Sequence, residues 1–277
     1  MKKKLVSTID FTVTGEKFDV ILNLDTEIAK TVPCPKKKKM ADYYRSTKYH
    51  SHNKPTNLFI SFLYNCVQKF MFKNKLDLIK KYVKEGSKLL DFGSGLGKFL
   101  IHADKIYETY AVEPIIYKSN FALEKGIQVK KSIDNYNLKN FDTITFWHSL
   151  EHVYQLNNLL EILSKNLKKN AYVFIAVPNL KSYDANKYKY YWAGYDVPRH
   201  LNHFSRKGIK KLLENFNFKL IETKPLFFDA FYVSYLSETY KKSKFPILKG
   251  FYNGVVSNIL ALKTKEFSSN IFIFKKN

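Results

Sequence analysis

The stretch Asp91-Phe92-Gly93-Ser94-Gly95-Leu96-Gly97 decides the fold, because it joins a short apolar strand, 88–92, to a predicted helix, 97–104. The chain has only 10 glycines in 277 residues, so three of them within five positions are not background. A strand that turns sharply into a helix while its backbone passes close to a ligand leaves no room for a Cβ. The start of the helix offers free N–H groups to a negatively charged group. The turn therefore predicts a nucleoside-cofactor site.

A carboxylate follows at the end of the next predicted strand, 109–113. Glu113 lies 20 residues after Gly93, where it can accept hydrogen bonds from both ribose hydroxyls of a nucleoside cofactor. The dinucleotide pattern GxGxxG would need a glycine at position 98, which is Lys98. This lysine argues against a nicotinamide-dependent oxidoreductase on a similar fold, which is the alternative hypothesis. No GxxxxGK[ST] segment is present, so a phosphate-loop NTPase is not expected.

Strand and helix patterns alternate along most of the chain. Such alternation implies a parallel sheet with helices on both faces, so we predict an α/β fold with a Rossmann-like, seven-stranded, mostly parallel sheet. The predicted strands are 88–92, 109–113, a weak one at 129, 141–147, 172–177, 220–223 and 271–274. The predicted helices are one or two within 56–84, then 97–104, 156–168, 206–215 and 251–262.

Residues 1–55 differ from the rest and are predicted to be a small β-containing extension, with two short strands around Thr14-Gly15-Glu16. Residues 56–277 form the main domain. Insertions near 180–204 and 225–265 interrupt the strand–helix alternation, and we expect them to act as a lid or as substrate elements. His50 and His52 are weighed as residues that close the pocket, against the simpler interpretation of surface side chains.

The net charge of +23 by itself favours an acidic partner. However, only Arg45, Arg199 and Arg206 are arginines, and bidentate recognition of bases or phosphates favours arginine over lysine. Nucleic acid is therefore not the expected substrate. Two cysteines make no disulfide framework, and neither a signal peptide nor a membrane-spanning run is recognised. We expect a cytoplasmic protein, with weak membrane-surface association suggested by the lysines and the apolar helix at 251–262.

Four segments in order resemble those of the class I S-adenosylmethionine-dependent methyltransferases. The glycine turn with Asp91 resembles their first motif, and Ala111-Val112-Glu113-Pro114 resembles their ribose-binding motif. Residues 141–152 resemble the fourth-strand motif of quinone-biosynthesis O-methyltransferases. Val177-Pro178-Asn179 and the stretch from Trp192 to Ser205 resemble a bacterial branch found beside cell-envelope genes. The resemblance covers roughly residues 56–224.

The resemblance implies S-adenosylmethionine as the cofactor and assigns residues to it by position. Asp91, Gly93, Ser94, Gly95 and Gly97 would hold its methionine part. Glu113 and the adjoining Pro114 would lie at the ribose, and Ser132 and Ile133 would flank the adenine. Trp147 and His148 would lie beside the sulfonium. The chain departs from the family pattern at Asn170-Ala171, where two glycines are usual, and Cys34 alone predicts no zinc ribbon in the N-terminal extension.

Histidines gather in two clusters that follow the same motifs. His148, Glu151 and His152 have i, i+3, i+4 spacing and would share one face of a helical turn, and His200 and His203 follow later. Three hypotheses stay open: a structural hydrogen-bonding role, general-base catalysis, or a divalent metal held by these residues. His148, His200, His152 and Glu151 are the candidate catalytic residues, and no metal is predicted.

The expected reaction is methyl transfer to a small-molecule, glycan or lipid-linked acceptor, preferably at oxygen. A non-catalytic S-adenosylmethionine-binding scaffold is the remaining alternative. Arg199 is expected either to pair with Asp196 or to bind an anionic group of the substrate.

Overall fold

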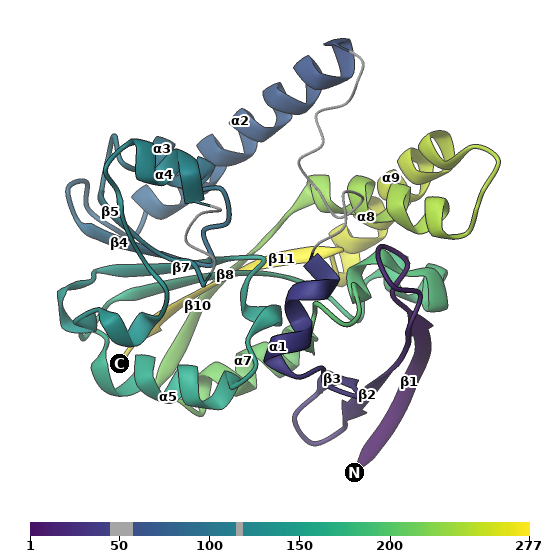
Figure 1. Ribbon diagram of the computed structural model, residues 1–277, viewed down its shortest axis with the longest axis horizontal. Helices are drawn as coiled ribbons and strands as arrows, with labels where there is room; N and C mark the ends of the chain where they lie inside the picture. The colour runs from purple at the N-terminus through teal and green to yellow at the C-terminus, as the bar shows by residue number, and fades with distance from the viewer. Residues whose placement is uncertain (45–57, 115–118) are drawn as a thin grey trace.

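The computed structural model describes residues 1–44, 58–114 and 119–277, with the side chains of the first long helix described from residue 67 onward (Figure 1). His50 and His52 therefore lie outside the described residues. The central sheet has seven strands in the order β10-β11-β8-β7-β4-β5-β6. Their bounds are β4 (Lys88–Phe92), β5 (Glu108–Val112), β6 (Gln128–Lys130), β7 (Thr143–Trp147), β8 (Tyr172–Pro178), β10 (Phe218–Pro225) and β11 (Ser269–Lys276).

The central sheet is parallel from β6 to β8, and β11 runs antiparallel to both of its neighbours. Its middle strands are nearly continuous apolar runs, as expected for strands that are covered on both faces. In β8, for example, residues 173–177 are all buried. The prediction of a seven-stranded, mostly parallel sheet is confirmed.

Helices cover both faces of this sheet (Figure 1). One layer consists of α2 (Leu58–Lys80), α3 (Lys98–Ala103) and α4 (Asn120–Glu124), and the other of α5 (Leu156–Asn166) and α7 (Arg206–Glu214). Each helix buries an apolar stripe. In α5 the stripe is Leu156, Leu159, Leu160 and Leu163, which recur at helical spacing. The two layers form separate apolar cores on the two sides of the sheet.

Two local predictions about helix ends are confirmed. Asn170, placed after α5 where a left-handed residue was expected, has φ 65°. Ser205 precedes α7, and its Oγ accepts a hydrogen bond from the N–H of Gly208 at 2.9 Å.

The N-terminal strands form a second, antiparallel sheet of four strands in the order β1-β2-β3-β9. Their bounds are β1 (Lys2–Ile9), β2 (Lys17–Asn23), β3 (Ile28–Val32) and β9 (Asn202–Phe204). Two details of the prediction were wrong. Phe11 and Val13 were predicted to belong to the first strand, but that strand ends at Ile9. The two residues lie in the turn, where Asp10 accepts hydrogen bonds from the N–H groups of Thr12 and Thr14. The third strand, β3, was not predicted.

The last strand of this sheet comes from the 180–204 insertion. β9 pairs with β3, with Ala29 opposite His203. Side chains of the N-terminal sheet, of the insertion and of α8 (Phe227–Tyr240) share a third apolar cluster. The insertion also contains α6 (Tyr183–Tyr188), and α1 (Lys37–Met40) follows β3. The extension and the insertion are therefore packed as one layer beside the central sheet.

A buried guanidinium joins these segments. Arg199 is 1% exposed. Its Nη2 lies 2.6 Å from Asp196 Oδ1 and 3.0 Å from Asp10 Oδ1, and its Nη1 donates to the carbonyl oxygen of Tyr43 at 3.1 Å. The predicted pairing with Asp196 is present, and the partner Asp10 was not foreseen. With its guanidinium directed at these partners, Arg199 ties the insertion to the N-terminal turn.

We predict that Arg199→Met lowers the free energy of unfolding by about 3–5 kcal/mol, because it leaves the carboxylates of Asp10 and Asp196 buried without their counter-charge. Urea unfolding followed by circular dichroism measures this loss. Lys181→Met is the matched control. It removes a more exposed ion pair with Glu27 and should cost less than about 1 kcal/mol. Equal losses in the two variants would contradict the assignment of Arg199 as the link.

Candidate functional site

The glycine turn is left-handed at all three of its glycines. The φ angles of Gly93, Gly95 and Gly97 are 74°, 53° and 75°, a region that favours glycine. The three have different surroundings. A Cβ on Gly93 would lie 2.6 Å from Ser149 Cβ, and one on Gly97 would lie 2.6 Å from Ala122 Cβ. At Gly95 a Cβ would have no atom of the described residues within 4 Å. Gly93 and Gly97 therefore permit close packing of the protein, and Gly95 borders open space.

Glu113 follows the carboxyl end of β5, beside the turn. Its Oε2 accepts a hydrogen bond from the N–H of Gly95 at 3.0 Å, and its side chain is buried. The Ser119 hydroxyl donates to the carbonyl oxygen of Gly95 at 2.8 Å and lies 3.1 Å from Ser94 Oγ. These contacts hold an acidic side chain at the open side of Gly95.

A buried acid and a buried base lie behind the turn. Burial raises the pKa of Asp91 to about 7, although Thr145 Oγ1 donates to its Oδ1 at 2.6 Å. Burial also lowers the pKa of Lys75 to about 8, against the attraction of Asp91 and Asp229. Lys75 Nζ lies 4.4 Å from the ring centroid of Trp147. The sequence analysis did not single out Lys75. The available signal was its place among the apolar positions Phe72, Leu76 and Ile79 of α2.

The other residues predicted for the cofactor lie along the same edge of the sheet, because β4, β5, β6 and β7 are parallel and their carboxyl ends share that edge. Pro114 is exposed. Ser132 Oγ caps the short helix Ile133–Asn135, and the side chain of Ile133 is buried in the core. Ile133 therefore has only its backbone to offer a ligand at this edge. Trp147 ends β7, and its buried indole N–H has no hydrogen-bond partner among the side chains and backbone that the structure describes.

S-adenosylmethionine fits this set of residues. Gly95, Glu113 and Trp147 lie at the carboxyl ends of β4, β5 and β7, which share one edge of the sheet. Open α/β sheets bind ligands outside the carboxyl ends of their strands. Asp91 and Glu113 would supply negative charge near a cofactor that carries an ammonium and a sulfonium group.

His148 follows β7 in the left-handed conformation, with φ 54°. Its Nε2 lies 3.0 Å from Asp229 Oδ2 of α8, and its Nδ1 lies 3.5 Å from Glu151 Oε1. Burial lowers the pKa of His148, but the combined attraction of Asp229 and Glu151 outweighs it and raises the pKa to about 10. His148 is therefore an imidazolium at neutral pH. Its partner Asp229 was missed because it lies 81 residues further along the chain.

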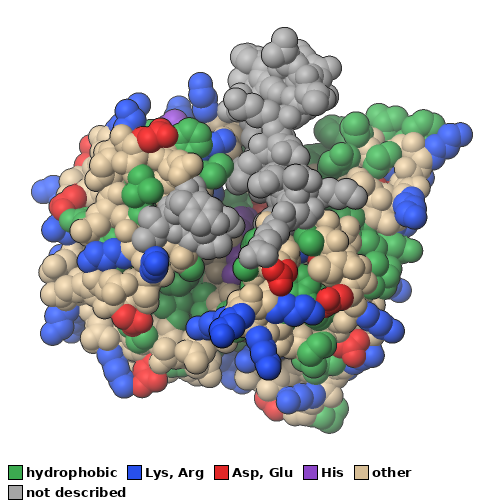
Figure 2. All heavy atoms as spheres, viewed as in Figure 1, with side chains coloured by type: hydrophobic (Ala, Val, Ile, Leu, Met, Phe, Trp, Pro, Cys, Tyr) green, Lys and Arg blue, Asp and Glu red, His purple; other side chains and the backbone are tan. Residues whose placement is uncertain are grey.

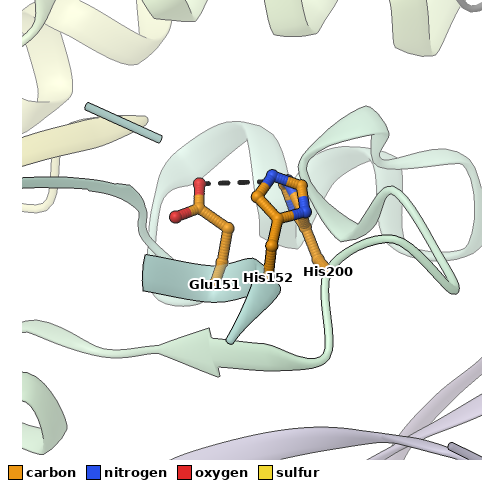
Figure 3. A group of neighbouring side chains, drawn as sticks. All are labelled: Glu151, His152 and His200. Carbon is orange, nitrogen blue, oxygen red and sulfur yellow. Dashed lines mark ion pairs between the residues drawn. The ribbon is translucent and has the colours of Figure 1, made fainter. Parts of the chain in front are cut away.

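Glu151, His152 and His200 converge (Figure 3), and Glu151 is also the residue that His148 Nδ1 contacts. Glu151 and His152 belong to the short helix Leu150–His152, and His200 comes from the loop before β9. One atom of each residue that could ligate a metal ion lies within 4.8 Å of the corresponding atoms of the other two residues. In the space-filling view, histidine side chains lie set back near the centre of the face (Figure 2). The two predicted histidine clusters are thus brought together by the fold, as the sequence motifs suggested.

Backbone carbonyls orient both rings. His152 Nδ1 lies 2.9 Å from the carbonyl oxygen of Arg199, and His200 Nδ1 lies 3.0 Å from that of Gly194. A carbonyl oxygen only accepts, so Nδ1 carries the proton in each ring and Nε2 of a neutral ring has the lone pair. His200 Nε2 lies 3.9 Å from Glu151 Oε1. Burial and the neighbouring His152 lower the pKa of His200, which is therefore neutral at pH 7.

Glu151 is 1% exposed, and neither of its carboxylate oxygens accepts a hydrogen bond from the described part of the chain. Burial raises its pKa, but His148, His200 and His152 outweigh this effect and keep the pKa below its usual value. Glu151, His152 and His200 are ligand types that could hold a divalent cation. His203 does not join them. Its Nε2 lies 2.9 Å from Thr31 Oγ1, and burial lowers its pKa to about 3.

A model of a methyltransferase domain family matches residues 67–223, more than half of the chain. The chain therefore belongs to this family. It is an S-adenosylmethionine-dependent methyltransferase, and S-adenosylmethionine is its cofactor. The family assignment replaces the alternative of a nicotinamide-dependent oxidoreductase.

Solved structures share the fold at low sequence identity. An S-adenosylmethionine-dependent methyltransferase from Thermotoga maritima has a TM-score of 0.50 and 16% identity, covering 78% of this chain and 97% of its own. The cyclopropane synthase MmaA2 from Mycobacterium tuberculosis has a TM-score of 0.51 and 14% identity, covering 73% and 83%. The [4+2]-cyclase SpnF has a TM-score of 0.51 and 13% identity, covering 72% and 78%. No curated protein matches the sequence.

We predict that Glu113→Gln weakens binding of S-adenosylhomocysteine by about 10- to 100-fold, because it removes a charged acceptor from the turn. Isothermal titration calorimetry measures the change. Glu108→Gln, an exposed substitution at the other end of β5, should leave the affinity unchanged. Unchanged affinity in Glu113→Gln would contradict the assignment of Glu113 to the ribose.

The charge of His148 should make stability depend on pH. Because the folded pKa of about 10 lies above the ordinary value of 6.5, this contribution is fully present below pH 6.5 and is lost as the pH rises toward 10. Asp229→Asn should lower the His148 pKa, which NMR titration of the ring protons measures. It should also reduce the loss of unfolding free energy between pH 7 and 10. Glu161→Gln on α5 is the control, and a His148 pKa near 6.5 in the unaltered protein would contradict the prediction.

Proposed function

We propose that the protein transfers the methyl group of S-adenosylmethionine to an oxygen atom of a small-molecule, glycan or lipid-linked acceptor. The observation that carries the choice of oxygen is the neutral His200, whose Nδ1 is held by the Gly194 carbonyl oxygen and whose Nε2 is the basic nitrogen. A hydroxyl must lose its proton to act as a nucleophile near neutral pH, and histidine suits that task.

The cofactor supplies an activated methyl group, so the protein mainly orients the reactants and excludes water. The residues predicted to orient the cofactor are Asp91, the turn glycines with Ser94, Glu113 with Pro114, and Trp147. Ser132 and Ile133 would lie at the adenine, where Ile133 would contribute its backbone. These assignments rest on the family pattern and on the shared edge of the sheet described above.

Among the candidate bases we favour His200. His148 and His152 have other tasks. The imidazolium of His148 lies between Asp229 and Glu151, where its single positive charge is shared by two carboxylates and holds the start of α8. His152 carries its proton on Nδ1, directed at the Arg199 carbonyl oxygen, and positions the loop that contains His200. Glu151 would stabilise the positive charge that His200 gains when it takes the proton.

No metal is included in the proposed mechanism. Glu151 already has the imidazolium of His148 at 3.5 Å, and this positive charge, which Asp229 shares, offsets part of the charge of its carboxylate. Of the three groups that could hold a cation, His200 would then act as the base, Glu151 as its electrostatic partner and His152 as the residue that positions the loop. Metal analysis in the experiment below separates this mechanism from the metal hypothesis.

The acceptor would be bound by the segments that depart from the strand–helix alternation. The 180–204 insertion supplies His200, and the 225–265 segment supplies Asp229, so both reach the candidate site. We infer a chain of two parts, an extension over 1–55 and a methyltransferase domain over 56–277, with these segments as lid and substrate elements. None of the helices among the described residues is long and apolar enough to cross a membrane. We propose a cytoplasmic location with contact to a membrane surface.

The test uses S-adenosylmethionine with a deuterated methyl group and fractionated cell extract, with mass spectrometry of the labelled products. We expect one labelled product whose fragments place the methyl on oxygen. His200→Gln should lower the rate by about 10²–10⁴-fold, because the proton acceptor is lost, with unchanged affinity for S-adenosylhomocysteine. The rate should fall in acid, as His200 gains a proton, and be level above pH 7.

His102→Gln, on the opposite layer in α3, is the matched histidine control and should keep its activity. A label on nitrogen or carbon would contradict the oxygen assignment. Cofactor binding without any labelled product would favour a non-catalytic scaffold. Protein purified without a polyhistidine tag should keep its rate in excess chelator, and loss of the rate together with bound metal would contradict the metal-free mechanism.

A further inference from the structure

The helical hairpin of α8 and α9 (Pro246–Thr264) has its large and small side chains in an unusual arrangement. The residues of α9 that are buried against the protein are small or polar. They are Gly250, Asn253, Gly254, Ser257 and Ala261. Its large apolar residues face outward, with Leu248 70% exposed and Phe251 63% exposed. The full set of outward residues on α9 is Ile247, Leu248, Phe251, Tyr252, Ile259, Leu260 and Leu262.

The partner helix α8 follows the same rule. It buries Ala230, Val233, Ser234, Ser237 and Glu238. Its exposed aromatic residues are Phe227, Phe228, Tyr232 and Tyr235. A surface helix of a water-soluble domain normally buries its large apolar residues and exposes its polar ones. In the α8–α9 hairpin, α9 reverses this order, and α8 reverses it in part, because it buries Val233 but exposes four aromatic residues.

The small residues bring the two helix backbones into close contact. A Cβ on Gly250 would lie 2.6 Å from Tyr235 Cα, and one on Gly254 would lie 2.6 Å from Phe231 Cδ1. Between the helices, Asn253 Nδ2 donates to Glu238 Oε1 of α8 at 3.4 Å. Small residues at the contact, polar groups between the helices and large apolar groups outside are typical of helices packed in lipid.

The charges of the hairpin complement an anionic surface. Six lysines lie between positions 239 and 265, and no Asp or Glu occurs there. The lysines lie at both ends of α9: Lys241, Lys242, Lys244 and Lys249 near its start, and Lys263 and Lys265 near its end. The two acids of α8, Asp229 and Glu238, are largely buried. In the space-filling view, hydrophobic side chains gather over this hairpin with lysines at its margin (Figure 2).

We propose that the α8–α9 hairpin lies in the surface layer of an anionic membrane, with its outward apolar face among the acyl chains and its lysines at the phosphate groups. Amphipathic helices that lie in this layer combine an apolar face with basic residues. Aromatic residues are common at the same depth. A second copy of the chain is disfavoured as the occupant, because it would bring two lysine-rich, acid-free surfaces together. The hairpin lies on the membrane, since none of the described helices is able to span it.

This arrangement also narrows the acceptor, a step that rests on the proposed function. Asp229, in the first turn of α8, contacts His148 of the candidate site. The exposed Phe227 and Phe228 directly precede it. The apolar surface of the hairpin is therefore continuous with the wall that holds the histidines, and the acceptor is an amphipathic lipid taken from the membrane surface.

The docking is tested by flotation with vesicles of phosphatidylcholine, with or without phosphatidylglycerol. The unaltered protein should float with the anionic vesicles and float less with phosphatidylcholine alone. The double variant Leu248→Glu with Phe251→Glu should lower the apparent affinity for anionic vesicles by at least about tenfold, because each apolar side chain contributes to burial in lipid. The double variant Leu5→Glu with Leu24→Glu removes two other exposed leucines with the same charge change, and it should float like the unaltered protein.

Affinity for S-adenosylhomocysteine, measured on the same preparations, should be equal in all three proteins and shows that the variants fold. The proposal is overturned if the unaltered protein does not float, or if the hairpin variant floats equally well. It is also overturned if light scattering shows that the unaltered protein is a dimer and that only the hairpin variant is a monomer. Flotation without methyl transfer to lipid would contradict the lipid acceptor but leave the docking and the proposed function intact.

Discussion

The candidate site depends on one buried guanidinium. Arg199 reaches Asp10 in the N-terminal turn, Asp196 in the insertion and the carbonyl oxygen of Tyr43 after α1. Its own carbonyl oxygen orients His152, and the next residue is His200. The N–H of Leu201 donates to the carbonyl oxygen of Glu151 at 2.8 Å. The ion pairs of Arg199 therefore fix the positions of Glu151, His152 and His200. Its charge is paired with carboxylates of the protein and not with a group of the substrate.

The glycine turn and the order of the central strands could be predicted because they depend on neighbouring residues. A glycine in the sequence indicates a position where φ can be positive, and this holds for Gly93, Gly95 and Gly97. The alternation of apolar strands with helices is compatible with only a few sheet topologies. The N-terminal sheet was predicted less well. β3 is short, and its partner β9 lies in a segment that reads as an irregular loop, so no local pattern reveals the pairing.

The chemistry of the histidines could be predicted only as a set of candidates. Their types and spacing identify a cluster, but the protonation state of each ring depends on groups distant in the sequence. Asp229 makes His148 a cation, and the Gly194 carbonyl oxygen leaves the lone pair of His200 on Nε2. Lys75 was missed for the same reason, since a lysine in an amphipathic helix normally faces water. Here Lys75 is buried among Trp147, Phe99 and the carboxylate of Asp91.

The pairing of β3 with β9 has a consequence for the order in which the protein is assembled. Ala29 and His203 are 174 positions apart, so the edge of β3 has no partner while the ribosome makes the strands between them. Strands β4 to β8, with the glycine turn, are synthesised before β9. The part of the site that is predicted to bind the nucleoside therefore leaves the ribosome first. The cluster of Glu151, His152 and His200 is completed only when residues 199–204 pair with the N-terminal sheet. An exposed strand edge over that interval is a place where a chaperone or a neighbouring chain can bind.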